Sequence, residues 1–330
     1  MNKSKTAAAP RLGPAPGAFT LVELLVVIAI IVLLVGILTP SLNKARQRAR
    51  DVRVRSEHRG IIAGMEMFHG EHDQYPPSAL RDANNQPAQD PIGGGSQNPP
   101  ANKIMSGAHY LARALVGRDL KGYAVPGTGP DADLYALDNY PNGKPIYSRS
   151  PTYINPEEYT LVKDSDAAMQ DYTINRAGVM PDMNKRPGEL MILDFHKYPI
   201  LYYRANPRAG RIITDPQNPQ DPRNRGIYDH RDNVYFTGDG GSNGGWQFKG
   251  RPHRIAAPGD PTAANWQPPV GPPQTFIEYI YNRQTWTTTA DSQNRNGRLE
   301  PYRKDSYLLI SAGFDGILGT DDDISNFIEK

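Results

Sequence analysis

Residues 19–38 read FTLVELLVVIAIIVLLVGIL, an apolar run of twenty residues in which Glu23 is the one ionisable side chain. Wound as an α-helix, such a run is about 30 Å long, which matches the hydrocarbon core of a lipid bilayer. Basic residues precede it, so a secretory signal peptide is the alternative interpretation. The run is longer than a usual signal core, however, and PSLN follows at positions 40–43 in place of a small-residue cleavage site. The sequence therefore favours a membrane-spanning anchor.

Glu23 is the most informative residue of this run. A lone carboxylate inside a membrane span is costly unless it is neutralised or paired. In one interpretation, Glu23 lies at the headgroup boundary and stays hydrated. In the other, it meets a cationic group supplied by another subunit.

The segment around Glu23 reads GAFTLVELLVV at positions 17–27, and it resembles the cleavage and methylation signature of type IV prepilins and type II secretion pseudopilins. The resemblance implies that a prepilin peptidase cuts between Ala18 and Phe19. The same enzyme would then methylate the new amine of Phe19. A cut after Gly17 is the alternative, because a glycine usually precedes the cut in this family.

The resemblance also implies a mechanism of assembly. The cationic N-terminal amine of one subunit would lie in the apolar filament core, where Glu23 of a neighbouring subunit neutralises it. Pro40 falls where the family usually has a proline, at the end of the membrane-embedded helical segment.

The expected protein is a structural subunit and not an enzyme. Its expected partners are further copies of itself, the prepilin peptidase and an inner-membrane assembly platform. We expect a single pass through the bacterial inner membrane with the head in the periplasm. The sequence does not decide whether the filament is a secretion pseudopilus or a type IV pilus.

The predicted fold class is α+β, with a long N-terminal hydrophobic helix packed on an antiparallel β-sheet head that has long Pro/Gly-rich loops. Residues 1–18 form the predicted leader, 19–75 the transmembrane and assembly helix, and 76–330 the globular head. The chain has 31 Gly and 31 Pro residues, a share that favours long connections such as 82–103.

The predicted helix continues past the apolar run and ends near Tyr75, because the residue before a proline is disfavoured in a helix. Two apolar stripes mark it, formed by Leu42, Ala45, Ala49 and Val52 and then by Ile61, Ile62, Met65 and Phe68. Between the stripes runs a basic face made of Lys44, Arg46, Arg48, Arg50, Arg53, Arg55 and Arg59. This face is interpreted as a solvated surface or as a contact to lipid headgroups or acidic neighbours. Nucleic acid is disfavoured as a partner, because no aromatic residues interleave with the basic ones.

Short apolar runs broken by turn residues predict the strands of the head. These runs are Tyr159–Val162, Leu190–Leu193, Ile200–Tyr203 and Thr275–Tyr281, and a short helix is predicted over Ile104–Leu115.

The second informative region is the C-terminal segment 306–327, which contains the string GFDGILGTDDDISNF. Adjacent carboxylates repel one another, and a hard cation relieves that repulsion by binding their oxygens. The segment resembles the calcium-binding loop at the C-terminus of major pseudopilins. This resemblance implies a structural Ca²⁺ held by Asp315 and by the group Asp321, Asp322 and Asp323. A solvated acidic turn is the alternative.

Composition limits the competing functions. The chain has no cysteine, so disulfides and thiolate metal sites are excluded, and a net charge of +2 gives no global field. A tethered hydrolase would need a carboxylate beside a histidine, and the candidate pairs are Asp194 with His196 and Asp229 with His230. Neither pair lies in a known catalytic motif. A surface adhesion protein that uses the pilin anchor for export is the remaining alternative.

Overall fold

The computed structural model describes residues 20–79, 106–117, 120–123, 150–163, 189–209, 226–237, 247–248, 251–256, 259, 272–282 and 300–328. The chain divides into two compact units, Met1–Ala49 and Arg50–Lys330. Helix α1 (Leu21–His72) begins in the first unit and ends in the second. Ala18, Phe19 and the predicted linker 82–103 lie outside the described residues.

Within the first unit, residues 21–38 of α1 are apolar apart from Glu23 and are exposed on all sides. Its large apolar side chains between Leu21 and Leu38 are 45–78% exposed. Pro40 lies inside the helix and does not end it. A proline removes one backbone donor, and the flanking hydroxyls satisfy nearby carbonyl oxygens. Thr39 Oγ1 donates to Val35 O at 2.7 Å, and Ser41 Oγ donates to Leu38 O at 2.8 Å.

Within the second unit, α1 buries one stripe against the head. The buried side chains recur at spacings of four and three residues, as a single helix face requires: Val54, His58, Ile61, Met65 and Phe68. The predicted stripe is thus confirmed from Ile61 onward. The stripe predicted further upstream, formed by Leu42, Ala45, Ala49 and Val52, is exposed, and Val54 is the first residue of α1 that is buried. The helix ends at His72, three residues before the predicted Tyr75, where Asp73 adopts a left-handed conformation with φ 54°.

The head contains small antiparallel sheets. Strand β1 (Thr160–Lys163) pairs with β2 (Leu190–Leu193), and β6 (Tyr307–Ser311) lies between β3 (Leu201–Arg204) and β7 (Ile324–Ser325). A third pair joins β4 (Gln247–Phe248) to β5 (Arg251–Pro252). Three of the four predicted strands are therefore confirmed to within a residue or two.

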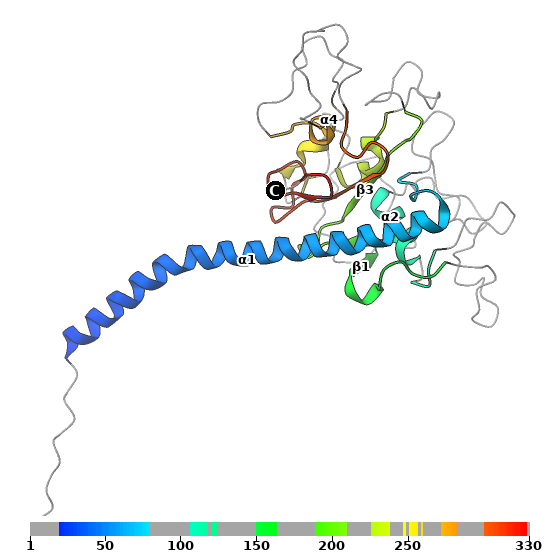
Figure 1. The fold of residues 1–330 in the computed structure, drawn as a ribbon. Coiled ribbons are helices and arrows are strands. Elements are labelled where there is room, and N and C mark those ends of the chain that lie inside the picture. The colour runs from blue at the N-terminus through cyan, green and yellow to red at the C-terminus, as the bar shows by residue number, and fades with distance from the viewer. Residues whose placement is uncertain are drawn as a thin grey trace, which may run out of the picture. The chain divides into compact units, whose positions relative to one another are not determined.

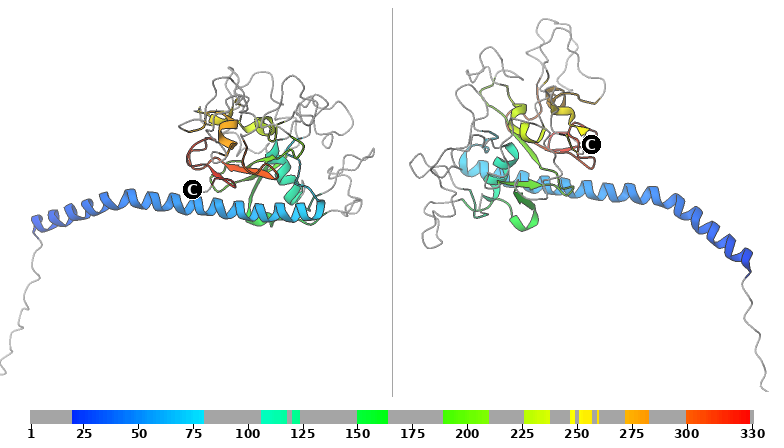
Figure 2. Two further views of the ribbon diagram at one scale, coloured as in Figure 1. Left: turned by 45° about the horizontal axis from the view of Figure 1, so that its top comes forward. Right: turned by 180° about the vertical axis from the view of Figure 1, so that it is seen from behind.

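Alternate residues of β2, β3 and β6 enter two hydrophobic cores, because successive side chains of a strand point to opposite faces. One core contains Tyr202 and Leu309 together with three buried side chains of α1 (Ile61, Met65 and Phe68) and the apolar side chains from Leu111 onward of helix α2 (Gly107–Val116). The other core contains Tyr203 and Leu308 with helix α4 (Phe276–Ile280). Figure 1 and Figure 2 show α4 and α2 on opposite sides of β3. Cores on both faces explain why these strands read as continuous apolar runs.

The fourth predicted strand was wrong, because residues 276–280 form helix α4. Thr275 is its N-cap and accepts a hydrogen bond from Glu278 N at 3.3 Å, while Glu278 Oε2 accepts one from Gln274 N at 2.7 Å. A short apolar run fits a buried strand and a buried helix turn equally well, and the capping residues decide here in favour of the helix.

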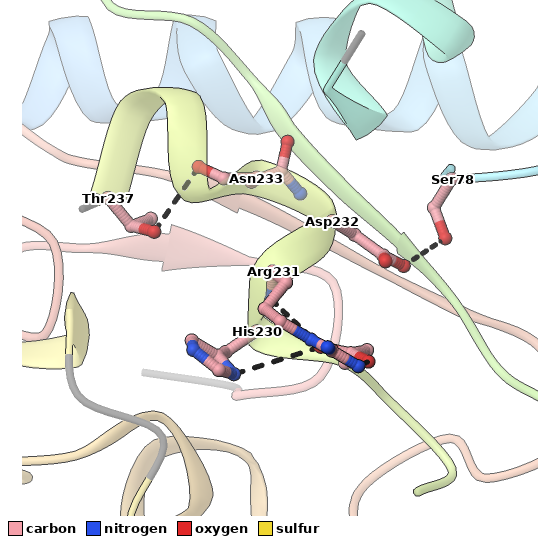
Figure 3. Close-up of polar contacts among 7 residues, drawn as sticks. Ser78, His230, Arg231, Asp232, Asn233 and Thr237 are labelled. Carbon is pink, nitrogen blue, oxygen red and sulfur yellow. Dashed lines mark hydrogen bonds and ion pairs between the residues drawn. The ribbon is translucent and has the colours of Figure 1, made fainter. Parts of the chain in front are cut away.

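A polar turn fastens α2 to the sheet. It consists of the 3₁₀ helix η8 (His230–Asn233), which continues into α3 (Val234–Thr237) (Figure 3). Asn233 Nδ2 donates to Tyr202 O at 2.7 Å, and Asn233 Oδ1 accepts from Ala108 N at 3.1 Å. Ser78 donates a short hydrogen bond to Asp232 in the same turn.

Two further short helices, η4 (Pro156–Glu158) and η9 (Arg254–Ala256), complete the described elements. The fold is a long N-terminal apolar helix with small antiparallel sheets, an α+β layout as predicted.

Candidate functional sites

The first site is the N-terminal turn of α1, where Thr20 and Glu23 form a reciprocal cap. Glu23 Oε2 accepts hydrogen bonds from Thr20 N and from Thr20 Oγ1, both at 2.8 Å. In return, Thr20 Oγ1 accepts a hydrogen bond from Glu23 N at 3.2 Å. This is the arrangement of a capping box, which satisfies donors that the first helical turn leaves unpaired. Sequence reasoning missed Thr20, although the spacing of a threonine three residues before a glutamate is a visible signal.

The surroundings of Glu23 offer no other polar partner within the described residues of the first unit. Its neighbours along α1 are apolar and exposed, and the next ionisable side chain of the helix is Lys44. Glu23 is thus a single carboxylate at the N-terminal end of an apolar rod. Ala18 and Phe19, which the resemblance implies for cleavage, precede the described residues.

The second site is the C-terminal loop between β6 and β7. Three glycines shape it: Gly313, Gly316 and Gly319, which have φ values of 63°, 71° and 93°. This left-handed region favours glycine. At Gly313 a Cβ atom would also lie 2.3 Å from Asp322 O, so the two arms of the loop touch there. The turn brings Asp315 close to Thr320 and Asp322.

Three of the four predicted ion ligands converge on the hydroxyl of Thr320. Its Oγ1 lies 2.6 Å from Asp322 Oδ1, 3.4 Å from Asp315 Oδ1 and 3.5 Å from Asp323 Oδ1. The carbonyl oxygen of Ile317 lies 3.0 Å from the same atom. A hydroxyl carries one proton, so it donates to one of these four acceptors at a time. The loop therefore concentrates more acceptor oxygens than the threonine supplies donors.

Backbone amides hold each of these carboxylates. Asp315 Oδ1 accepts from Ile317 N at 2.7 Å, Asp322 Oδ2 from Asp315 N at 2.9 Å, and Asp323 Oδ2 from Gly319 N at 2.7 Å. Asp323 is only 4% exposed. Burial, reinforced by the charge of Asp323, raises the pKa of Tyr279 well above its ordinary value. The fourth predicted ligand, Asp321, is exposed.

The donor set fits a hard cation in its chemistry, because it consists of carboxylate, hydroxyl and carbonyl oxygens. In the described part of the chain, no three acidic or histidine side chains are already spaced to coordinate one ion directly. Thr320 Oγ1 occupies the point on which the oxygens converge, so an ion would require that hydroxyl to become a ligand or to turn aside.

Two residues outside the predicted set fasten the loop to the head. Asn326 Oδ1 accepts from Leu309 N at 2.9 Å, and its Nδ2 donates to Tyr307 O at 3.2 Å. His253 Nδ1 accepts from Leu318 N at 3.1 Å. Burial lowers the pKa of His253 to about 4, which keeps this nitrogen an acceptor at neutral pH. The string DISNF contains Asn326, whereas nothing local in the sequence indicates His253.

The structure shows the contacts of the two candidate catalytic pairs. Asp194 is fully buried, and its Oδ1 accepts a hydrogen bond from Tyr198 N at 3.0 Å. His196 lies 3.8 Å from Asp51 of α1. Asp229 Oδ2 accepts from Arg231 Nη2 at 2.6 Å, and His230 lies 3.7 Å from the other oxygen. The aspartates are thus engaged by a backbone amide in one pair and by a guanidinium in the other.

A buried polar cluster made of His58, Asp194 and Ser311 connects three elements. His58 Nε2 lies 2.9 Å from Ser311 Oγ, and Ser311 also contacts the Asp194 carboxylate. These residue types occur in hydrolases, but the side chains are at most 3% exposed, so a substrate cannot reach them in this arrangement. The cluster joins α1, β6 and the turn after β2.

Comparisons with models of known protein families, with curated proteins and with solved structures found no match for this chain. One described helix, α1, is long and apolar enough to cross a membrane. The functional assignment therefore rests on the residues of the two sites.

Proposed function

We propose that this chain is the structural subunit of a filament of the type II secretion pseudopilus or type IV pilus kind. A prepilin peptidase removes residues 1–18 and methylates the amine of Phe19. The mature chain is held in the bacterial inner membrane by the apolar part of α1, with the head in the periplasm. It polymerises through α1 on an inner-membrane assembly platform.

The observation that carries the proposal is a carboxylate placed at the start of an exposed apolar rod. The apolar side chains between Leu21 and Leu38 are exposed on every side of α1. Such a surface needs lipid or other apolar helices around it. Glu23 then sits four residues after the proposed N-terminal amine. A membrane anchor alone needs no acid at that position, and an acid there is costly unless a cation accompanies it.

The capping box and the proposed intersubunit pair are compatible. In the precursor, Glu23 satisfies the Thr20 amide at 2.8 Å. In an assembled filament, the carboxylate has further lone pairs that can accept the Phe19 ammonium of a neighbour. An ion pair in a low-dielectric core is stable once formed, whereas a missing partner is destabilising. Glu23 would therefore fix the axial register of the subunits.

We further propose that a structural Ca²⁺ binds the C-terminal loop through Asp315, Asp322 and Asp323, with Asp321 at its edge. The excess of acceptor oxygens around Thr320 supports this. An ion there would clamp the chain terminus to β6, so binding would couple to the stability of the head.

The mass of the N-terminal peptide tests the proposal. The protein is purified from its native membrane and digested, and its first peptide is measured. We expect a peptide that begins at N-methylated Phe19. A peptide that begins at Met1 would indicate an unprocessed anchor, and one that begins after Leu38 would indicate a removed signal peptide. Either result would overturn the filament-subunit assignment and favour an anchored adhesion protein or a secreted one.

A further inference from the structure

Three cations follow the apolar span closely, and all belong to the first unit. Lys44, Arg46 and Arg48 are exposed along α1, and we call them the basic collar. Between Glu23 and Asp51 the chain has no acidic residue. The nearest carboxylate on the same helix is Asp51, three residues after Arg48, and its single negative charge stands against the three cations, so the collar concentrates net positive charge within five residues.

The collar lies at the height of the headgroups if the apolar run fills the hydrocarbon layer. Lys44 comes six residues after Leu38, the end of the run. At a rise of 1.5 Å per residue this is about 9 Å along the axis, and Arg48 is about 15 Å away. Helical side chains lean toward the N-terminus, here toward the bilayer, so their arms of about 6 Å bring the charges back to the headgroup layer.

The distribution of the collar around the helix indicates what binds it. Successive residues are separated by about 100° of rotation, so Lys44 and Arg48 share one face while Arg46 lies on the opposite side. A single protein partner contacts one face of a helix. A layer of lipid headgroups surrounds the helix and meets cations on every face.

We propose that the basic collar binds anionic phospholipid headgroups and so fixes the depth of the unassembled subunit in the membrane. This inference rests on the membrane span of the proposed function. Anionic headgroups attract basic segments next to a span, and the attraction weakens with salt. The collar would hold α1 deeper in an anionic bilayer than in a zwitterionic one.

The test measures the depth of a single label beside the collar. The chain has no cysteine, so Ala49→Cys gives one site for a bimane fluorophore in the full-length protein. The protein is reconstituted in vesicles of phosphatidylcholine alone, or with about 30% phosphatidylglycerol. Both kinds of vesicle carry a lipid spin-labelled at its headgroup. We expect quenching to be about twofold stronger in the anionic vesicles and the difference to vanish in ~0.5 M NaCl.

Matched variants assign the effect to the collar. The triple variant Lys44→Gln, Arg46→Gln and Arg48→Gln should quench equally in both vesicles. A control that removes three exposed cations of the head, Lys121→Gln, Lys163→Gln and Lys304→Gln, should retain the difference. The inference is overturned if the unmodified chain quenches equally in both vesicles or if the collar variant keeps the difference. If quenching changes with the protein-to-lipid ratio and not with the charge of the lipid, the collar binds a second copy of the chain, and the lipid inference is overturned. Flotation is measured in parallel: a chain that fails to float with vesicles overturns the span itself, whereas equal quenching in floating chains overturns only the collar.

Discussion

His58 Nε2 and Ser311 Oγ lie 2.9 Å apart, although 253 residues separate them in the chain. The contact joins α1 to β6 inside the head. His58 is 3% exposed, and burial lowers its pKa to about 4. The imidazole is thus neutral in the folded protein at neutral pH. Its other ring nitrogen, Nδ1, has no hydrogen-bond partner among the described residues.

Acid should therefore destabilise the head through His58. Between pH 6.5 and about 4, the unfolded chain takes up a proton at this residue and the folded chain does not. The free energy of unfolding is therefore at its full value above pH 6.5. It decreases by up to roughly 3 kcal/mol as the pH drops from 6.5 to about 4. His58→Leu should lower the melting temperature at pH 7 and flatten this acid slope, as measured by circular dichroism of the full chain in neutral detergent. His253 has a similar pKa and should retain its own share of the slope. An unchanged slope would contradict the role of His58.

Asp194 should have the opposite pH dependence. Burial is the main cause that raises its pKa from 3.8 to about 7, and the nearby charge of Glu57 contributes to that rise. Between these pH values the folded chain keeps a proton that the unfolded chain has lost, so stability falls as the pH rises and is lowest above pH 7. Asp194→Asn mimics the protonated side chain. We expect it to raise the free energy of unfolding at pH 8 by up to roughly 4 kcal/mol and to change little at pH 3.5. Asp305→Asn, at an exposed position, is the control and should be neutral at both pH values. A loss of stability at pH 8 would show that the ionised carboxylate is needed.

Gly107 should be intolerant of any side chain. A Cβ atom there would lie 1.9 Å from Tyr202 O, where α2 meets β3. Gly107→Ala must therefore push the helix off the sheet and break the Asn233 bridge, which we expect to cost several kcal/mol in unfolding free energy. Gly70→Ala is the matched control, because nothing lies within 4 Å of its Cβ position on α1. That change should stabilise the helix by about 1 kcal/mol. Equal melting temperatures for the two variants would contradict the close approach.

Local patterns in the sequence predicted α1 from its long apolar run and helical periodicity, and three strands from short apolar runs bounded by turn residues. Residues 275–281 were misassigned because an apolar run of that length carries no decisive period, whereas the capping pair Thr275 and Glu278 did indicate a helix. The capping partner Thr20 was equally visible in the sequence. The convergence of the aspartates on Thr320 was not, because it depends on where three left-handed glycines turn the backbone. The contact of His58 with Ser311 joins distant segments, so no local pattern could predict it.

Calcium should raise the melting temperature of the head, and the size of this increase should depend on the hydroxyl of Thr320. In the unmodified chain, the hydroxyl partly relieves the repulsion between Asp315, Asp322 and Asp323. Thr320→Val removes that donor, so we expect a lower melting temperature without calcium and a larger gain on its addition, of about 2–3 kcal/mol at saturating ion. Asp322→Asn should instead abolish most of the gain, and Asp305→Asn should leave it unchanged. Melting is followed by circular dichroism in chelator, in Ca²⁺ and in Mg²⁺. No shift with Ca²⁺ in either the unmodified chain or Thr320→Val would eliminate the proposed ion.

Glu23 offers the sharpest test of assembly, because its capping and pairing roles can be separated. A glutamine three residues after the N-cap still reaches back to the Thr20 amide, but it carries no charge. Glu23→Gln should therefore keep α1 intact and the protein in the membrane, yet yield no filaments. Thr20→Val removes the hydroxyl from the cap and leaves the charge, so it should assemble at near-normal levels. Glu300→Ala, which removes an exposed carboxylate of the head, is the control for lost charge. Filaments are counted by electron microscopy of sheared cells, and membrane levels are measured by immunoblot. Normal filaments from Glu23→Gln, combined with failure of Thr20→Val, would assign Glu23 to the helix cap alone and refute the intersubunit pair.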